Sequence, residues 1–261
     1  TGFGAINGDS VMDFSHKFKD LKTMLASGST LKEGNLIPLV EVNYLPVIPN
    51  PEKIICVGVN YASHIAEMGR EPGEFPLLFT RFANSQVGHN EPMLVPKESE
   101  KFDYEGELAL IIGKSGKRIS ENNAMNYIAG YSCYNDGSVR DWQRHTSQFT
   151  AGKNFTGTGG FGPWMVSSDE INDPSELQIE TRLNGTVMQS APISDLVFNV
   201  PKLIAYISTF TELEPGDVII TGTTGGVGAA RNPPVWMKAG DTVEVEISNI
   251  GTLVNPLHNA N

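Results

Sequence analysis

Short apolar runs rich in β-branched residues recur along most of the chain, and they constrain its fold more than any other feature. Runs of this kind are typical of buried β-strands. They lie at 53–59, 108–112, 164–167, 177–183, 217–221 and 242–247. Helical patterns are few and lie at 17–27, at 120–130 behind a possible Ser120 cap, and from Pro201 onward. Because strands and helices do not alternate regularly, we predict an α+β fold that is mostly β.

The first 50 residues differ from the rest of the chain. They combine a hairpin-like start around Asn7-Gly8-Asp9 with the helical pattern at 17–27, which Gly28 closes. Repeated prolines from Pro46 to Pro51 read as a connector. We therefore predict a small N-terminal domain over 1–50 and a larger domain over 51–261, which is long enough to bury a sizeable core.

The charge balance narrows the choice of partners. A formal net charge of −11 disfavours binding to nucleic acid or to an anionic membrane surface, since both depend on clustered Lys and Arg. The sequence shows neither an apolar run of roughly 18 residues nor the pattern of a signal peptide. We expect a cytoplasmic location. Cys56 and Cys133 lie in apolar or aromatic stretches without CxxC spacing, so we predict two buried, reduced thiols.

The segment 103–112 carries the most chemical information. Asp103, Glu105 and Glu107 alternate along a predicted strand, so they share one face with about 7 Å between neighbours. An exposed edge strand would also show this pattern. However, the run that follows is apolar on both faces, which indicates that the acidic end lies beside the core, near a cleft. Gathered carboxylates suit a hard cation such as Mg²⁺, Mn²⁺ or Ca²⁺, and the absence of His and Cys argues against zinc.

Two glycine-rich segments must be weighed as nucleotide-binding loops. The segment 157–162 formally matches GxGxxG, but no strand precedes it, and Pro163 with a strand-like stretch follows where a helix should begin. The segment 222–228 lacks the Gly-Lys-Ser/Thr ending of a phosphate loop. Neither segment therefore supports a dinucleotide or nucleotide site.

Three further positions have ordinary explanations when taken alone. The turn at Asn135-Asp136-Gly137 is common turn chemistry. His64 and Glu67 are three residues apart, a spacing that would suit a surface pair on one helical turn. Lys153 would be a routine surface lysine.

Six motifs in order change these interpretations. They are Val-Gly-Val-Asn-Tyr-Ala-Ser-His-Ile-Ala-Glu, Asp-Tyr-Glu-Gly-Glu-Leu-Ala, Gly-Tyr-Ser-Cys-Tyr-Asn-Asp-Gly-Ser-Val-Arg-Asp-Trp-Gln, Gly-Lys-Asn-Phe, Asp-Val-Ile-Ile-Thr-Gly-Thr and Gly-Asp-Thr-Val-Glu-Val-Glu-Ile. Together they span roughly 53–256, and the chain resembles the fumarylacetoacetate hydrolase family over this range. The resemblance implies a mixed β-sandwich roll with a small N-terminal domain, and a homodimer.

The resemblance also implies a metal site. Glu105, Glu107 and Asp136 match the family's metal ligands, whereas Asp103 matches a position that is not usually a ligand. Mg²⁺ or Mn²⁺ is the expected cofactor, with Ca²⁺ also possible. Arg140 is expected to brace the metal loop.

The remaining site residues are likewise implied by the resemblance. His64 and Glu67 match a pair on a lid over the substrate, in which the glutamate orients the imidazole and the imidazole activates water. Lys153 matches a lysine that stabilises an enolate oxygen. Gln143 and Thr223 match positions that contact substrate.

The sequence departs from the family pattern at three places. Thr80-Arg81 stands in place of a Lys-Pro pair, Thr156 replaces a frequent aspartate, and Thr224 replaces a proline. We expect Arg81 and Thr224 to contact the far end of the substrate.

The activity implied is metal-dependent hydrolysis of a carbon–carbon bond in a small acylpyruvate or β-dicarbonyl compound. Oxaloacetate decarboxylation, or isomerisation or dehydration of a 2-oxo acid, could use the same site. A non-catalytic binding protein with this fold is a further alternative, and the intact ligand set and His-Glu pair argue against it.

Overall fold

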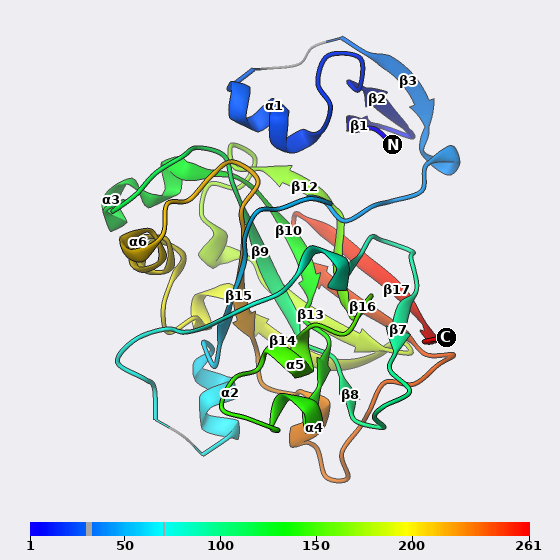
Figure 1. Ribbon diagram of the computed structural model, residues 1–261, viewed down its shortest axis with the longest axis vertical. Helices are drawn as coiled ribbons and strands as arrows, with labels where there is room; N and C mark the ends of the chain where they lie inside the picture. Colours follow the sequence, from blue (N-terminus) through cyan, green and yellow to red (C-terminus); the bar gives the residue numbers. More distant parts are fainter. Residues whose placement is uncertain (30–32, 70) are drawn as a thin grey trace.

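A computed structural model describes residues 1–29, 33–69 and 71–261 and shows a chain built mainly from β-strands (Figure 1). Two large sheets form the body, and their strands contact one another where β12 and β10 face β17 and β16. The predicted α+β, mostly β class is confirmed. Both Cys56 and Cys133 are buried free thiols, as predicted.

The main sheet carries the functional residues discussed below. Its neighbouring strands pair in both directions: β4 and β15 are parallel, whereas β9 is antiparallel to both β15 and β10. In spatial order the strands are β5 (Leu77–Thr80), β4 (Ile54–Gly58), β15 (Val218–Thr223), β9 (Gly106–Ile112), β10 (Ile128–Asn135), β12 (Gly159–Ser167) and β6 (Gln86–Val87).

The second sheet packs against one face of the main sheet. Its order is β14 (Thr186–Pro192), β13 (Gln178–Leu183), β16 (Thr242–Ile247), β17 (Gly251–Asn259) and β7 (Met93–Val95). A short ladder joins β8 (Phe102–Asp103) to β11 (Ser138–Val139) beside the beginning of β9.

Strand β9 lies at the centre of the core. Leu108, Leu110 and Ile112 face one hydrophobic cluster, whereas Ala109 and Ile111 face another. The strand is therefore buried on both faces, as its unbroken apolar run predicted. This fixes the position of the acidic residues at its start.

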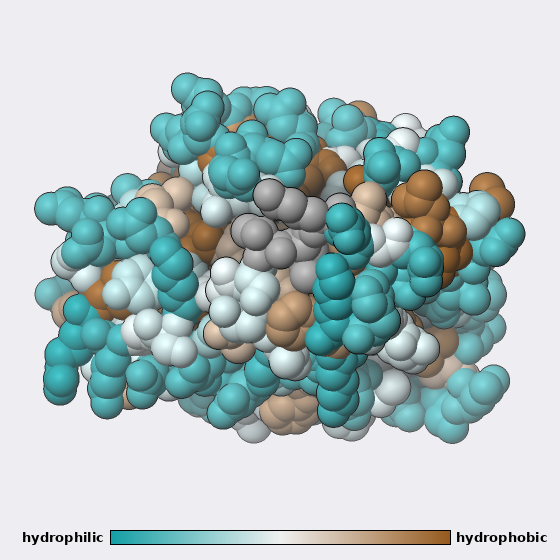
Figure 2. All heavy atoms as spheres, turned by 90° about the horizontal axis from the view of Figure 1, so that it is seen from above, coloured by the Kyte–Doolittle hydropathy of each residue, from teal (hydrophilic) through white to brown (hydrophobic). Residues whose placement is uncertain are grey.

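The N-terminal segment forms a separate three-stranded sheet of β1 (Gly4–Asn7), β2 (Ser10–Asp13) and β3 (Asn35–Pro38), with helix α1 (Leu21–Ser27). The predicted hairpin is present, and Gly28 ends α1 at φ 62°, in the left-handed region that glycine tolerates. Seen from this end, the surface is mainly hydrophilic with separate hydrophobic patches (Figure 2). The domain boundary at residue 50 stays a prediction.

The remaining helices lie at two places. Helices α2 (Ala62–Glu67), α4 (Arg140–Gln143) and α5 (Thr150–Lys153) lie toward the lower end of Figure 1, away from the N-terminal layer at the top. Helices α3 (Glu121–Ala124) and α6 (Val200–Phe210) pack against each other. Asn199 caps α6, and its predicted apolar face is buried.

One predicted helix is shorter than expected. The pattern at 120–130 gives only α3 and a following 3₁₀ turn, and the side chain of Ser120 makes no capping hydrogen bond. From Ile128 onward the chain instead forms β10, which pairs with both β9 and β12. Strand pairing with segments distant in sequence therefore overrides the local helical pattern.

Most of the run that matches GxGxxG lies in a strand. Gly159, Gly160 and Gly162 all belong to β12, and a Cβ at Gly160 would lie only 2.5 Å from Oδ1 of Asn255. The glycines allow neighbouring strands to approach closely, so no nucleotide-binding role is needed to explain them. Within the described part of the chain, no helix is long and apolar enough to cross a membrane.

Candidate active site

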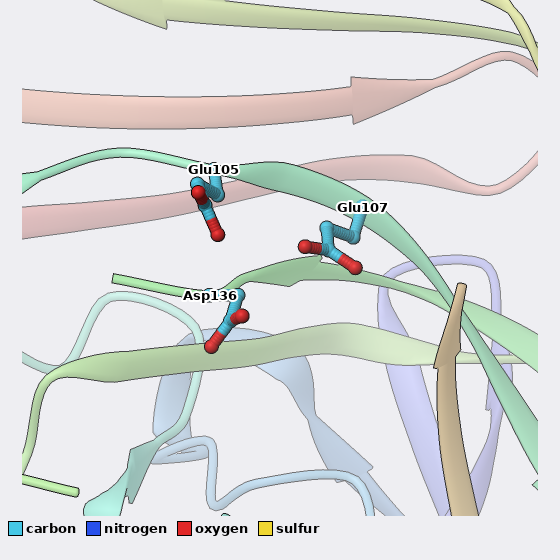
Figure 3. A group of neighbouring side chains, drawn as sticks. All are labelled: Glu105, Glu107 and Asp136. Carbon is cyan, nitrogen blue, oxygen red and sulfur yellow. The ribbon is translucent and has the colours of Figure 1, made fainter. Parts of the chain in front are cut away.

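Three carboxylates meet where the interior strands β9 and β10 of the main sheet begin and end, respectively (Figure 3). Glu107 lies in β9, Glu105 lies just before it, and Asp136 directly follows β10. The antiparallel register of β9 and β10 places these positions next to each other, and the Asp136 N–H donates to the Glu105 carbonyl at 2.8 Å. One oxygen from each carboxylate lies within 4.8 Å of the others, and all three residues are buried. The structure thus brings together the three residues that the resemblance implies as metal ligands.

Three cationic side chains balance part of this negative charge. The ammonium of Lys153 lies 2.5 Å from oxygens of both Glu105 and Asp136. Arg81 pairs with Asp136 at 2.6 Å, and Arg140 pairs with Glu105 at 2.7 Å. Although burial alone would raise it, Arg140 and Lys153 hold the pKa of Glu105 at about 2.

Glu107 is balanced less well than its two neighbours. Among the residues that the structure describes it forms no ion pair, and its carboxylate accepts one backbone hydrogen bond, from Gly222 at 2.5 Å. Burial, followed by the charges of Asp136 and Glu105, raises the pKa of Glu107 well above its usual range. One of the three buried carboxylates therefore lacks a cation.

This donor set fits a hard divalent ion. Carboxylate oxygens are the ligands that Mg²⁺, Mn²⁺ and Ca²⁺ prefer, and a bound cation would give Glu107 a positively charged partner. His and Cys are absent from the group, so the site does not resemble a zinc centre.

Lys153 is not a surface lysine. Only 1% of the residue is exposed, at the end of α5. Burial alone would lower its pKa, but Asp136 and Glu105 outweigh this effect and raise it, so the side chain is a cation within the site. The surface interpretation of this residue is wrong.

Asp103 does not join the three carboxylates. The chain leaves β8 at Asp103 and enters β9 only at Gly106, so the continuous strand expected over the acidic segment is interrupted. The Asp103 carboxylate instead accepts the N–H groups of Gly228 and Ala229 at 2.8 and 2.9 Å and pairs with Arg140 at 2.8 Å. It thereby ties the glycine-rich loop to the arginine that contacts Glu105.

A small cavity of about 180 Å³ opens beside the carboxylates. It lies below the range of about 300–1,000 Å³ typical of sites for drug-sized ligands, which points to a small substrate. Among the predicted site residues, its lining includes His64, Glu105, Glu107, Gln143, Lys153 and Thr223. The structure therefore gathers six positions, separated by up to 159 residues, around one cavity.

His64, which belongs to helix α2, lines this cavity. Its Nδ1 lies 3.1 Å from the carboxylate of Glu67, whose other oxygen accepts the Gly226 N–H at 2.9 Å. At the start of the helix, the Ser63 N–H and hydroxyl both donate to Asp195, at 3.0 and 2.6 Å. His64 is buried, and the side chain of Glu67 is 26% exposed. The two ends of α2 are thus anchored to different loops.

Arg81 does not lie where it was expected, whereas Arg140 contacts the acidic residues that it was expected to brace. Arg81, expected to contact substrate, is buried and does not line the cavity; its guanidinium donates to Asp136, the Gly137 carbonyl and Thr158. The hydrogen-bond donors of Arg81 are therefore used to hold Asp136 and the turn at Gly137 in place. Arg140 both braces Asp103 and Glu105 and lines the cavity.

Thr224 also lies away from the cavity lining, and its carbonyl accepts a hydrogen bond from Gln189 at 3.0 Å. The same amide donates to the hydroxyl of Thr223 at 2.7 Å. Sequence reasoning missed Gln189, Gly226 and Asp195, because each acts through a contact with a segment distant in sequence. It also missed Arg144, which lines the cavity and which its spacing from Arg140 could have revealed.

Comparison with known proteins gives consistent results. Residues 53–258 match the family model described as fumarylacetoacetate (FAA) hydrolase C-terminal. An oxaloacetate tautomerase of Xenopus laevis, described as mitochondrial, is 44% identical over 218 residues, covering 83% of this chain and 68% of that protein.

Two solved structures extend the comparison. Fumarylacetoacetate hydrolase from Exiguobacterium antarcticum has a TM-score of 0.90 and 34% identity, with 99% of this chain and 95% of that chain covered. Maleylpyruvate hydrolase from Sphingobium, in complex with manganese (II) ion and pyruvate, has a TM-score of 0.81 and 26% identity, with 100% and 97% covered.

Proposed function

The chain belongs to the fumarylacetoacetate hydrolase family, and from this premise we propose that it is a divalent-metal-dependent enzyme that interconverts the keto and enol forms of a short 2-oxo acid. One observation carries the proposal. The imidazole of His64, paired with Glu67, lines the same cavity as the carboxylates of Glu105 and Glu107. A proton-transfer group and a cation-binding group thus face one small substrate.

One of the relatives supports this choice among the family's reactions. The Xenopus protein is described as an oxaloacetate tautomerase, and oxaloacetate is a short 2-oxo acid of the size that suits the cavity. Tautomerisation moves only a proton, so a single base that can also act as an acid is sufficient.

The residues of this chain have distinct parts in such a reaction. A divalent ion held by Glu105, Glu107 and Asp136 would polarise the 2-oxo group as a Lewis acid. With Nδ1 of His64 paired to Glu67, Nε2 would take a proton from the enol hydroxyl and deliver it to the adjacent carbon. The charges of Lys153 and Arg140 favour negative charge on the substrate oxygen while the proton is in transit.

Hydrolysis of a carbon–carbon bond is a second candidate. The same imidazole could take a proton from a water molecule, which would then attack the distal carbonyl of an acylpyruvate. The similarity to maleylpyruvate hydrolase favours this alternative. Oxaloacetate decarboxylation would also use the cation-binding group, but it needs no attacking water. The expected homodimer and cytoplasmic location stay predictions.

Proton exchange separates these reactions. In D₂O with Mg²⁺, a tautomerase should speed the loss of the C3 proton signals of oxaloacetate in NMR spectra, without forming additional pyruvate. Pyruvate formed from an acylpyruvate would indicate the hydrolase, and pyruvate formed from oxaloacetate the decarboxylase. Oxaloacetate exchange no faster than in matched buffer containing Mg²⁺ would contradict the proposed function.

A further inference from the structure

The cavity carries a cation that the proposed reaction does not use. Arg140, Gln143 and Arg144 have the spacing i, i+3 and i+4 at helix α4, which places them on one side of the turn, and all three line the cavity. We propose that Arg144 binds a second carboxylate at the far end of the substrate and makes the enzyme selective for short 2-oxo dicarboxylates. This inference rests on the proposed function.

The pairing of the cavity's cations distinguishes Arg144 from the others. Lys153 is held by Glu105 and Asp136, and Arg140 is held by Asp103 and Glu105. Arg144 is exposed, and within the described ranges its guanidinium forms no ion pair or hydrogen bond with a protein group. It is therefore the arginine of this cavity whose donors are available to an incoming anion.

Apolar residues elsewhere in the cavity wall make the positive charge of Arg144 important for binding a carboxylate. Val57, Val59, Met68, Phe79 and Phe149 contribute apolar surface to the cavity. A carboxylate that enters such surroundings loses hydration, and this costs free energy unless a cation or a hydrogen-bond donor replaces the water. An acidic protein with a net charge of −11 would otherwise repel a dianionic substrate. Arg144 supplies both charge and donors at the one place where a second carboxylate would need them.

The chemistry of arginine sharpens the inference. A guanidinium can donate two parallel hydrogen bonds to a carboxylate, which a lysine ammonium cannot do with the same geometry. Losing a hydrogen bond to a charged group typically weakens binding by about 10- to 100-fold. For a ligand that has a methyl group in place of this carboxylate, the affinity should hardly depend on Arg144.

A matched pair of ligands tests this directly. Oxaloacetate and 2-oxobutyrate differ by a carboxylate in place of a methyl group, and calorimetry on the Mg²⁺-loaded protein measures the affinity for each. Arg144→Gln should weaken oxaloacetate binding about 10- to 100-fold and change 2-oxobutyrate binding by less than about twofold. Arg144→Lys should lie between wild type and Arg144→Gln. The control is Arg118→Gln, which removes an exposed arginine outside this cavity and should alter neither affinity.

The outcomes separate this inference from the proposed function. Equal weakening of both ligands by Arg144→Gln, or no weakening of either, would overturn the role of Arg144 even if the enzyme exchanges the C3 proton. Conversely, Arg144-dependent binding of oxaloacetate without catalysed exchange would uphold the subsite and refute the tautomerase. Failure of the wild-type protein to prefer oxaloacetate over 2-oxobutyrate would also overturn the inference.

Discussion

The floor and the rim of the cavity are built in different ways. The floor consists of the buried carboxylates Glu105, Glu107 and Asp136, placed by the ladder between β9 and β10; Glu105 and Glu107 line the cavity. The rim consists of α2 and α4, short helices of six and four residues. Helices this short are not stable alone, so their position depends on side-chain contacts with neighbouring loops.

This difference between floor and rim suggests that ion binding and turnover depend on separate parts of the site. We expect the floor to bind a cation whenever the sheet is folded, because these carboxylates move only if the core does. The rim carries the His64–Glu67 pair and Arg144, held by a few hydrogen bonds such as that from Gly226 to Glu67. Changes at the floor should therefore abolish ion binding, whereas changes at the rim should alter turnover or substrate choice and leave the ion in place.

The largest effect is expected for Glu107→Gln at the floor. Loss of a charged ligand should weaken Mg²⁺ or Mn²⁺ binding by more than about 100-fold, beyond the effect typical of residues that only support a ligand. Because the buried carboxylate lacks a cation partner, the neutral amide should not destabilise the ion-free protein. Titration calorimetry and thermal melting measure the two effects. Unchanged affinity would remove Glu107 from the ligand set, and Glu98→Gln, at an exposed glutamate, is the control.

His64→Gln at the rim should lower turnover and leave ion binding unchanged, whereas Glu107→Gln at the floor should weaken ion binding. Turnover should fall by about 10² to 10⁴, the usual contribution of a general acid–base group, while ion affinity stays within about twofold. The proton-exchange assay and calorimetry on one preparation provide both values. His16→Gln, at an exposed histidine of the N-terminal layer, should behave as wild type. Full activity in His64→Gln would place the base elsewhere.

Lys153→Met tests how the floor is balanced without an ion. Removing a buried cation leaves Glu105 and Asp136 underbalanced, which should cost about 3–5 kcal/mol and lower the melting temperature by about 6–20 °C. Saturating Mn²⁺ should recover much of this loss, because the ion supplies positive charge to the same carboxylates. An identical loss with and without Mn²⁺ would show that Lys153 does not balance the ion-binding carboxylates.

The smallest effect is expected for Asp195→Asn, which weakens the anchor of α2. Its carboxylate accepts both the N–H and the hydroxyl of Ser63, so kcat/KM should fall by up to about tenfold with ion affinity unchanged. Ser63→Ala should give a similar loss, and the double variant should lose less than the sum of the two. Fully additive losses would mean that the two residues do not act as one anchor.

The floor could be predicted from sequence more readily than the rim. Alternating acids beside an unbroken apolar run form a local pattern, and it pointed to Asp103, Glu105 and Glu107 as a group. The family resemblance was needed to add Asp136 and to set Asp103 aside. The interrupted strand at Tyr104 shows the limit of that geometry, since alternation alone would have placed Asp103 on the same face.

Residues that depend on distant contacts were harder to interpret. Arg81 finds its partner Asp136 55 positions away, so nothing in its own segment showed that its donors are used inside the protein. Likewise, the helix expected over 120–130 ends early, because the chain from Ile128 onward pairs with β9 and β12 as strand β10. The spacing of Arg140, Gln143 and Arg144 is local, but it acquires meaning only when the cavity is known.

The central claim is that Glu105, Glu107 and Asp136 hold one divalent ion, and anomalous diffraction from crystals grown with Mn²⁺ tests it most directly. The account predicts a single strong Mn²⁺ peak at about 2.0–2.6 Å from an oxygen of each of the three carboxylates, the range for hard divalent ions. A peak elsewhere, or no peak while Lys153 still bridges Glu105 and Asp136, would contradict it.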